Sequence, residues 1–314
     1  MTRSIDYETY RFCTLCPRMC RADRRLRTGF CGCSDRLTAA RAALHHWEEP
    51  CISGAPKDQR GSGTVFFSGC TLGCFFCQNA SISQDHFGKE LSARQLADLF
   101  LRLQDQGAYN INLITPTQYL PHILEALDLA RPALQIPIVY NCGGYERVQT
   151  VKALEGYVDV WLPDFKYMDS GLSLGCSKAA DYFSAASAAI AQMIRQTGPL
   201  IWDQTSASVP LLKRGVIIRH MVLPGHRQDS ISLLRWISET LPKDRFLISL
   251  LSQYTPWFHS EAFPELNRRI TTFEYRQVVD EALRLGLNRG FMQEKSSAKE
   301  EYTPPFNLEG LEDL

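Results

Sequence analysis

The stretch Gly63-Thr-Val-Phe-Phe-Ser-Gly-Cys70-Thr-Leu-Gly-Cys74-Phe-Phe-Cys77-Gln-Asn79 determines how the rest of the chain is interpreted. An apolar run of β character, 64–67, leads through Ser68-Gly69 into three cysteines spaced Cys-x3-Cys-x2-Cys. Three thiolates so close in sequence cannot all pair as disulfides, but they can face one metal centre, and soft thiolates favour iron–sulfur clusters or zinc. Three ligands also leave a coordination position open, which is typical of a site with a chemical role. A partial zinc knuckle completed by His86 is the alternative interpretation.

Composition limits the classes of protein. The chain has 314 residues, 45% of them hydrophobic and 22% charged, which suits one large domain or two small ones with a normal core. Lys plus Arg equals Asp plus Glu at 34 each, so bulk charge argues against nucleic-acid or anionic-membrane partners. No run approaches the length of a membrane span, and the first residues contain no apolar export signal. Eleven cysteines in such a chain predict a cytoplasmic location and metal ligation, not disulfides.

A second group of cysteines precedes the quoted stretch. A four-thiolate set, as a closed metal site requires, is available from Cys13, Cys16, Cys20 and either Cys31 or Cys33. A structural zinc site, an auxiliary iron–sulfur cluster and merely buried thiols all fit this spacing. The arginines between positions 18 and 27 are interpreted as a solvated face or as a collar that neutralises thiolate charge. No aromatic residues alternate with them as a nucleic-acid platform would need.

From Thr64 onward, short β runs alternate with amphipathic helices, the pattern of parallel βα units. Ser92-x-x-Gln95 predicts a capping box at the start of one helix, and Gly107 marks its end. We expect a Cys-rich extension (1–60), an α/β core (61–256) and a C-terminal helix and tail (257–314). The six expected strands lie near 64–67, 110–115, 137–141, 158–166, 215–223 and 246–251.

The ends of these strands supply candidate binding residues, because ligands collect at the carboxyl ends of parallel strands. Asp164 and Lys166 share one side of an extended strand, where they could bind the amine and carboxylate of an amino acid or simply form a salt bridge. Gly143 and Gly144, after Asn141, permit close backbone approach to a ligand. Further candidates for a wall or lid are Tyr254, Trp257 and residues 291–293.

The cysteine loop at the end of a strand, with Phe76 just before its last cysteine, resembles the radical S-adenosylmethionine (SAM) superfamily. The resemblance implies a partial (β/α)6 TIM-like barrel of the radical SAM type with a Cys-rich N-terminal extension. It also implies that Cys70, Cys74 and Cys77 hold a [4Fe-4S] cluster whose fourth iron binds SAM. Reductive cleavage of SAM would then produce a 5′-deoxyadenosyl radical.

The same resemblance assigns roles around the cofactor. Asp164 and Lys166 are similar to a pair that contacts the methionine part of SAM in glycyl-radical-enzyme activases, and Arg219 to an arginine that faces its carboxylate. Radical SAM proteins usually carry Gly-Gly-Glu after the second strand, where this chain has Thr115-Pro-Thr117. The amine contact is therefore expected from Thr115, Thr117 and Asp164.

Longer motifs resemble the branch described as pyruvate formate-lyase-activating-enzyme-like, PflX type. They include Cys-x2-Cys-Pro-Arg-x-Cys, Trp-Glu-Glu-Pro-x-Ile-Ser-Gly, Arg-His-x-Val-Leu-Pro-Gly and Ser-Gln-Tyr, and they span most of the chain. This resemblance implies an oxidoreductase that receives an electron from a flavodoxin or ferredoxin and abstracts hydrogen from a protein or peptide. Two alternatives stay open: the same chemistry on a small molecule, and a non-enzymatic iron–sulfur electron carrier indifferent to SAM.

Overall fold

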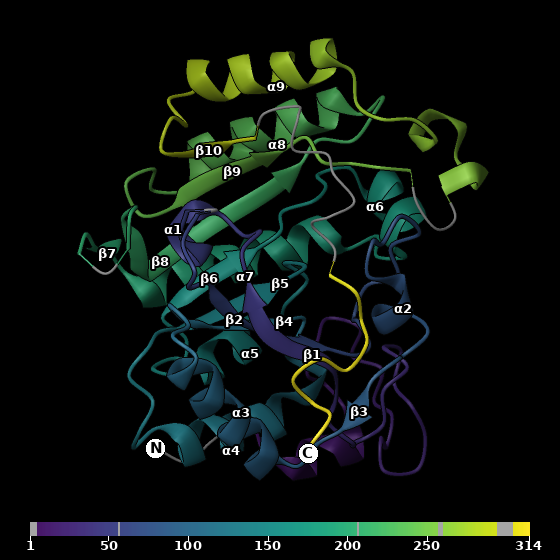
Figure 1. Ribbon diagram of the computed structural model, residues 1–314. Coiled ribbons are helices and arrows are strands. Elements are labelled where there is room, and N and C mark those ends of the chain that lie inside the picture. Colours follow the sequence, from purple (N-terminus) through teal and green to yellow (C-terminus); the bar gives the residue numbers. More distant parts are fainter. Residues whose placement is uncertain (1–4, 56, 206, 257–259, 294–303) are drawn as a thin grey trace.

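The computed structural model describes residues 5–55, 57–205, 207–256, 260–293 and 304–314 (Figure 1). Trp257 and part of the predicted C-terminal segment lie outside these ranges. The described strands form one mixed sheet in the order β10-β9-β8-β6-β5-β4-β2-β1-β3, and β7 pairs with β8 beside this path. The strands are β1 (Thr38–His45), β2 (Ser62–Phe67), β3 (Lys89–Glu90), β4 (Ile111–Ile114), β5 (Ile138–Cys142), β6 (Val160–Pro163), β7 (Ile201–Asp203), β8 (Leu211–Met221), β9 (Leu247–Leu251) and β10 (Gly290–Met292).

The helices connect and cover these strands, as alternating βα units predict. The short α1 (Pro50–Ser53) and α2 (Ala80–Ser83) lie in the N-terminal part, whereas α8 and α9 lie side by side near β9 and β10 (Figure 1). The other helices are α3 (Ala93–Asp105), α4 (Leu120–Ala130), α5 (Val148–Ala153), α6 (Ser170–Ser177), α7 (Tyr182–Thr197), α8 (Arg227–Thr240) and α9 (Thr272–Arg284). Short 3-10 helices are η1 (Tyr7–Phe12), η2 (Thr117–Tyr119), η3 (Ser260–Ala262) and η4 (Pro264–Leu266).

Helix α3 shows how local sequence sets an element. The predicted capping box is present: the Gln95 amide donates to the Ser92 hydroxyl at 3.2 Å, and the Ser92 amide donates to the Gln95 side chain at 2.9 Å. Both bonds satisfy amide groups that a helix start leaves unpaired. Gly107, with φ of 89°, follows the last turn in the left-handed region that glycine adopts without strain. The predicted helix boundaries are confirmed.

All six predicted strands are present, as β2, β4, β5, β6, β8 and β9, and consecutive members pair in parallel. Their register brings the predicted site residues to one edge of the sheet. Ile114 on β4 pairs with Asn141 on β5, and just beyond β6 an isolated parallel bridge joins Asp164 to Arg219 on β8. The mixed α/β class with a parallel sheet is therefore confirmed.

Four further strands were not predicted, and β1 is the most consequential. Its sequence, Thr-Ala-Ala-Arg-Ala-Ala-Leu-His, is rich in alanine, which favours helix when packing does not decide. Antiparallel pairing with β2 imposes the strand instead. The C-terminal tail covers the other edge of β1, because Leu308 donates to the Ala40 carbonyl at 3.1 Å and Ala42 to the Glu309 carbonyl at 2.9 Å. In Figure 1 this yellow tail runs beside β1.

The predicted boundary at residue 60 thus falls between two paired strands, β1 and β2. The partial (β/α)6 barrel stays a prediction. In the described ranges the end strands of the sheet, β3 and β10, do not pair with each other, so the sheet is not a closed barrel. None of the described helices combines the length and apolar character that a membrane crossing would need.

Candidate metal centre and active site

A cavity of about 260 Å³ lies at the carboxyl edge of the parallel strands. The loop that follows β2 forms one wall, and residues at the ends of β4, β5, β6 and β8 form the others. The predicted site residues that line it are Cys70, Phe76, Cys74, Cys77, Thr115, Asn141, Gly143, Asp164, Lys166 and Arg219. Residues far apart in sequence therefore meet where the strand-end rule places ligands.

The three thiols of the loop are held by hydroxyl groups and backbone. The Cys74 sulfur lies 2.9 Å from the Ser177 hydroxyl, and the Cys77 sulfur lies 3.2 Å from the Ser83 hydroxyl. Burial raises the pKa of Cys70, and it also raises the pKa of Cys77. A bound metal would favour the thiolate form of such ligands, which is the usual coupling between metal binding and ligand ionisation.

Gln118, which the sequence analysis did not select, holds the start of this loop. Its side-chain amide group lies 2.9 Å from the Ser68 carbonyl, 3.0 Å from the Gly69 carbonyl and 2.8 Å from the Thr115 carbonyl. Thr115 itself has φ of 56°, a left-handed conformation that is rare for a β-branched residue. Such strain gathers at functional sites, where the surrounding contacts hold it in place.

A row of alternating charges lines the same cavity as the thiols. Lys166 donates to Asp164 at 2.6 Å, and Arg219 donates to the other oxygen of Asp164 at 2.9 Å. Arg219 also donates to Glu48 at 3.1 Å and to the Asn141 side-chain oxygen at 2.5 Å. The predicted residues do form salt bridges with one another, in a row that runs cation, anion, cation, anion. We refer to Lys166, Asp164, Arg219 and Glu48 as the charge row.

Glu48 is the functional residue that the sequence analysis missed. It comes from the segment between β1 and α1, and its side chain is only 9% exposed. One of its oxygens accepts from the Asn112 amide at 3.2 Å and from the Asn141 amide at 3.0 Å. The available signal was the adjacent acid pair before Pro50, since an acidic side chain is rarely buried without a partner.

Mutual contact sets the ionisation of the charge row. Burial alone would raise the pKa of Asp164, but the cations of Arg219 and Lys166 outweigh it and hold that pKa below its usual value. Burial opposes the charge of Lys166, yet the Asp164 carboxylate raises the pKa of Lys166. For Glu48, burial raises the pKa more than Arg219 lowers it. The row therefore holds two cations and one firm anion, and burial opposes the charge of its fourth member, Glu48.

Two predicted residues lie outside the lining of this cavity. The Thr117 hydroxyl is buried and donates to Glu146 at 2.6 Å, so the amine contact expected of Thr117 is not available in this arrangement. Gly144 supports the site from behind: with φ of 76°, a Cβ there would lie 2.0 Å from the Asp164 carbonyl oxygen. Only glycine permits this approach between the β5 and β6 ends.

Aromatic side chains cover the thiol loop. Phe76 packs edge-to-face on Tyr254 with ring centroids 5.5 Å apart, and both line the cavity. Phe75 stacks on Phe263 at 4.0 Å on the outer side of the loop. Such a cover keeps water from a buried metal centre and tunes its potential.

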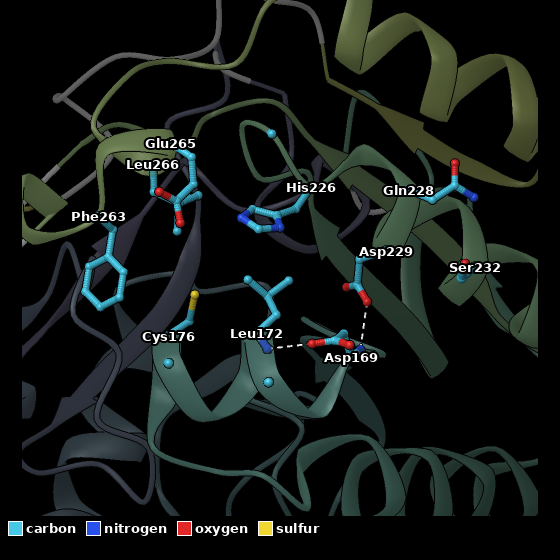
Figure 2. Close-up of a pocket in the computed structure, with 13 residues that line it drawn as sticks. Asp169, Leu172, Cys176, His226, Gln228, Asp229, Ser232, Phe263, Glu265 and Leu266 are labelled. Carbon is cyan, nitrogen blue, oxygen red and sulfur yellow. Dashed lines mark hydrogen bonds between the residues drawn. The ribbon is translucent and has the colours of Figure 1, made fainter.

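A second cavity, of about 550 Å³, opens between α6, the start of α8 and the segment that carries Phe263 (Figure 2). In Figure 2 the His226 ring points into this space. Two of its three acids are already engaged, because Asp169 accepts from the Leu172 amide and Asp229 accepts from the Asp169 amide. The three thiols of the loop and the charge row line the smaller cavity instead.

The donor set of the smaller cavity fits a cluster better than a single ion. In the described ranges, no three His, Cys, Asp or Glu side chains are placed to share one metal ion. An iron–sulfur cluster makes no such demand, because each cysteine binds a different iron. The zinc alternative is not supported, since His86 packs on Gly32, where a Cβ would lie 2.0 Å from its ring, and does not line the cavity.

Fold and site together define an α/β protein with a thiol-lined, charge-lined cavity at the carboxyl edge of a parallel sheet. No protein-family model matches the chain. Over 294 residues it is 29% identical to an uncharacterized protein of Methanocaldococcus jannaschii, covering 90% of this chain and 78% of that protein.

Among solved structures, the chain is similar to Streptococcus suis SuiB bound to the precursor peptide SuiA, with 16% identity, a TM-score of 0.48 and coverage of 72% of this chain and 46% of SuiB. It is also similar to native anSMEcpe with bound AdoMet, with 14% identity, a TM-score of 0.46 and coverage of 71% and 61%. The chain thus spans about half the length of SuiB.

Proposed function

We propose that this chain is a radical SAM enzyme in which Cys70, Cys74 and Cys77 hold a [4Fe-4S] cluster. One observation carries the proposal: the three thiols and the charge row line the same buried cavity. When bound, the cluster and SAM supply a 5′-deoxyadenosyl radical for hydrogen abstraction, while the protein supplies position, dryness and charge.

The charge row suits the zwitterionic end of SAM. A ligand carboxylate can replace Asp164 as the partner of Lys166 or Arg219, and a ligand amine can take the carboxylates so released. Glu48 adds an acceptor where the Thr117 hydroxyl, bonded to Glu146, does not supply one. Each ion pair that opens is thereby replaced by another, so no buried charge is left alone.

Other residues set the space and keep it dry. Gly143 allows close approach on the Leu72 side, because a Cβ there would lie 2.8 Å from Leu72. Leu72, Phe76 and Tyr254 exclude water from the thiols. Thr115, strained at the end of β4, keeps its carbonyl on Gln118 and so fixes the wall next to the loop.

The finer part of the proposal concerns substrate and partners. The motifs shared with the PflX-type branch support hydrogen abstraction from a protein or peptide, with a small molecule as the alternative. They also support a flavodoxin or ferredoxin as the one-electron donor, and the unpaired thiols suit a reducing cytoplasm.

The test is an anaerobic reconstitution of the full chain with iron and sulfide. Electron paramagnetic resonance of the dithionite-reduced protein is recorded with and without SAM, and 5′-deoxyadenosine is quantified. The Cys74→Ala variant is compared with Cys51→Ala, which removes a buried thiol outside the cavity. Both preparations are checked for folding by circular dichroism.

A radical SAM enzyme should show a SAM-dependent change in the spectrum and 5′-deoxyadenosine formation. Both should be lost in Cys74→Ala and kept in Cys51→Ala. A reducible cluster whose spectrum ignores SAM would overturn the proposal and leave the electron-carrier alternative standing.

A further inference from the structure

A second group of thiols lies outside the cavity, in the loop between η1 and β1. The Cys20 and Cys31 sulfurs both pack on Gly29, where a Cβ would lie 3.4 Å from one and 3.5 Å from the other. Cys13 is close enough to interact electrostatically with Cys20, and Cys16 with Cys13 and Cys31. We call Cys13, Cys16, Cys20 and Cys31 the N-terminal thiol set. Four thiols thus lie close together, and none of the described cysteines forms a disulfide.

The backbone is strained where it turns Cys20 inward. Met19 has φ of 43° and Arg21 has φ of 55°, so non-glycine residues in the left-handed region stand on both sides of this cysteine. Such conformations are costly for non-glycine residues and persist only where the surroundings enforce them. Here the Arg21 amide donates to the Cys13 carbonyl at 2.9 Å, and the Cys13 amide donates to the Ala22 carbonyl at 3.1 Å. Two strained residues and two backbone bonds thus tie Cys20 to Cys13.

A buried cation stands beside these thiols. Arg24 is only 1% exposed and donates to the carbonyls of Cys33, at 3.1 Å, and Gln118, at 2.5 Å. No carboxylate pairs with it among the residues that the structure describes, and the groups that favour its charge most are the thiols of Cys31 and Cys13 and the Tyr10 hydroxyl. The guanidinium also donates to the Ser34 carbonyl and lies over the Tyr10 ring, 4.6 Å from its centroid, and a nearby negative charge would stabilise it further. Thiolates bound to a metal centre would supply it.

The structure separates the alternatives that the cysteine spacing left open. The Cys33 sulfur contacts Cys31, whose carbonyl accepts from it at 3.4 Å, but it also donates to the Ser68 carbonyl at 3.6 Å and lies where a Cβ on Gly69 would be. The Cys31 sulfur instead packs on Gly29 together with that of Cys20. Cys31 is therefore the fourth member. No three thiols of the set are placed to share one ion, in the ranges described, whereas a [4Fe-4S] cluster takes one cysteine per iron.

We propose that the N-terminal thiol set holds a second iron–sulfur cluster, with Arg24 as its buried counter-cation. The site is fully ligated by protein, unlike the open site in the cavity. Arg18 stands between Cys16 and Cys20 in the sequence, and it donates to the Thr71 carbonyl at 2.9 Å and to the Ser177 carbonyl at 3.0 Å. The second cluster would therefore also secure the loop that carries Cys70 and Cys74.

The test uses the full chain with Cys70, Cys74 and Cys77 all changed to alanine, so that iron bound elsewhere is counted alone. The protein is incubated anaerobically with equal ferrous iron and zinc, plus sulfide, and then desalted. Iron, zinc and acid-labile sulfide are counted, and a Mössbauer spectrum identifies the cluster. Cys20→Ala is then added to this background, with Cys51→Ala as the matched control.

The triple variant should keep about four irons and four sulfides per chain with almost no zinc, as expected for a [4Fe-4S] cluster. Cys20→Ala should abolish this iron, and Cys51→Ala should not. One zinc and no iron, or a folded variant without metal, would overturn the proposal.

If the triple variant does not fold, the same count is made on Cys20→Ala alone. Its iron should fall by about half from the roughly eight per chain expected of two [4Fe-4S] clusters. Equal iron in Cys20→Ala and the unmodified chain would overturn the proposal. Failure of the radical SAM proposal would appear instead as a cluster spectrum indifferent to SAM, with the N-terminal iron unchanged.

Discussion

Replacing Glu48 with glutamine tests whether the charge row binds the zwitterionic end of SAM. The change removes one negative charge 3.1 Å from the Arg219 guanidinium and keeps the shape of the side chain. The oxygen that accepts from Asn112 and Asn141 can also be kept, because glutamine retains one carbonyl oxygen. The main loss is therefore the charge available to a ligand amine.

The magnitude follows from the cost of a charged hydrogen bond. Such a bond contributes about 1.5–3 kcal/mol, and about 1.4 kcal/mol corresponds to a tenfold change in affinity. We expect the Kd for SAM to rise about 10- to 100-fold in Glu48→Gln. Isothermal titration of the anaerobically reconstituted protein, at equal iron content per chain, measures this Kd.

Glu49→Gln is the matched control. The Glu49 carboxyl is buried beside Glu48 but does not line the cavity, so its neutralisation should change the Kd little. Burial raises the pKa of Glu49 as it does that of Glu48, so the two variants differ in whether the carboxyl faces the cavity and not in the direction of the pKa shift. Equal SAM affinity in the two variants, with both folded and equally loaded, would refute a role for Glu48 in binding the amine.

Three further predictions concern other buried contacts. Burial raises the pKa of Glu146 from 4.5 to about 8, so the native state binds this proton more tightly than the unfolded chain, and stability falls as the pH rises from about 4.5 to about 8. Glu146→Gln should remove this dependence of the unfolding free energy on pH, a slope of up to about 1.4 kcal/mol per pH unit. If urea denaturation gives the same pH dependence for the variant and the unmodified chain across this window, the prediction is contradicted. Gly144→Ala should melt at a lower temperature than Gly156→Ala, because both glycines have positive φ but only at Gly144 would a Cβ clash, at 2.0 Å from the Asp164 carbonyl oxygen. Equal melting temperatures would show that the backbone around Asp164 shifts to accept the Cβ. Ser177→Ala should lower the cluster potential in a redox titration, since it removes the hydroxyl 2.9 Å from the Cys74 sulfur, and an unchanged potential would exclude that donor.

Local structure was largely predictable because its causes are local. The capping box that begins α3 depends on two side chains three residues apart, Ser92 and Gln95, and it forms as the pattern indicates. Strand β1 was not predictable in the same way. Its alanines carry no β preference, and only pairing with β2 and with the tail around Leu308 makes it a strand.

The residues of the candidate site were likewise predictable only in part. Asp164, Lys166 and Arg219 could be selected because each stands at the end of a predicted strand, and parallel strands bring such ends together. Thr117 was expected to face the ligand, but η2 begins at this residue and buries its hydroxyl against Glu146. A single turn of helix thus removed from the cavity a residue only two positions after Thr115, which does line it.

The sequence by itself determined the thiol loop, the six parallel strands and the edge of the sheet where the chemistry lies, because spacing and periodicity act over a few residues. Only the tertiary structure decided that Glu48 joins Arg219, 171 positions away, and that the sulfurs of Cys20 and Cys31 pack on the same glycine, Gly29. These contacts depend on how the segment before β2 folds over the strand ends. No pattern within a short window of sequence encodes the distance between residues that meet through a sheet.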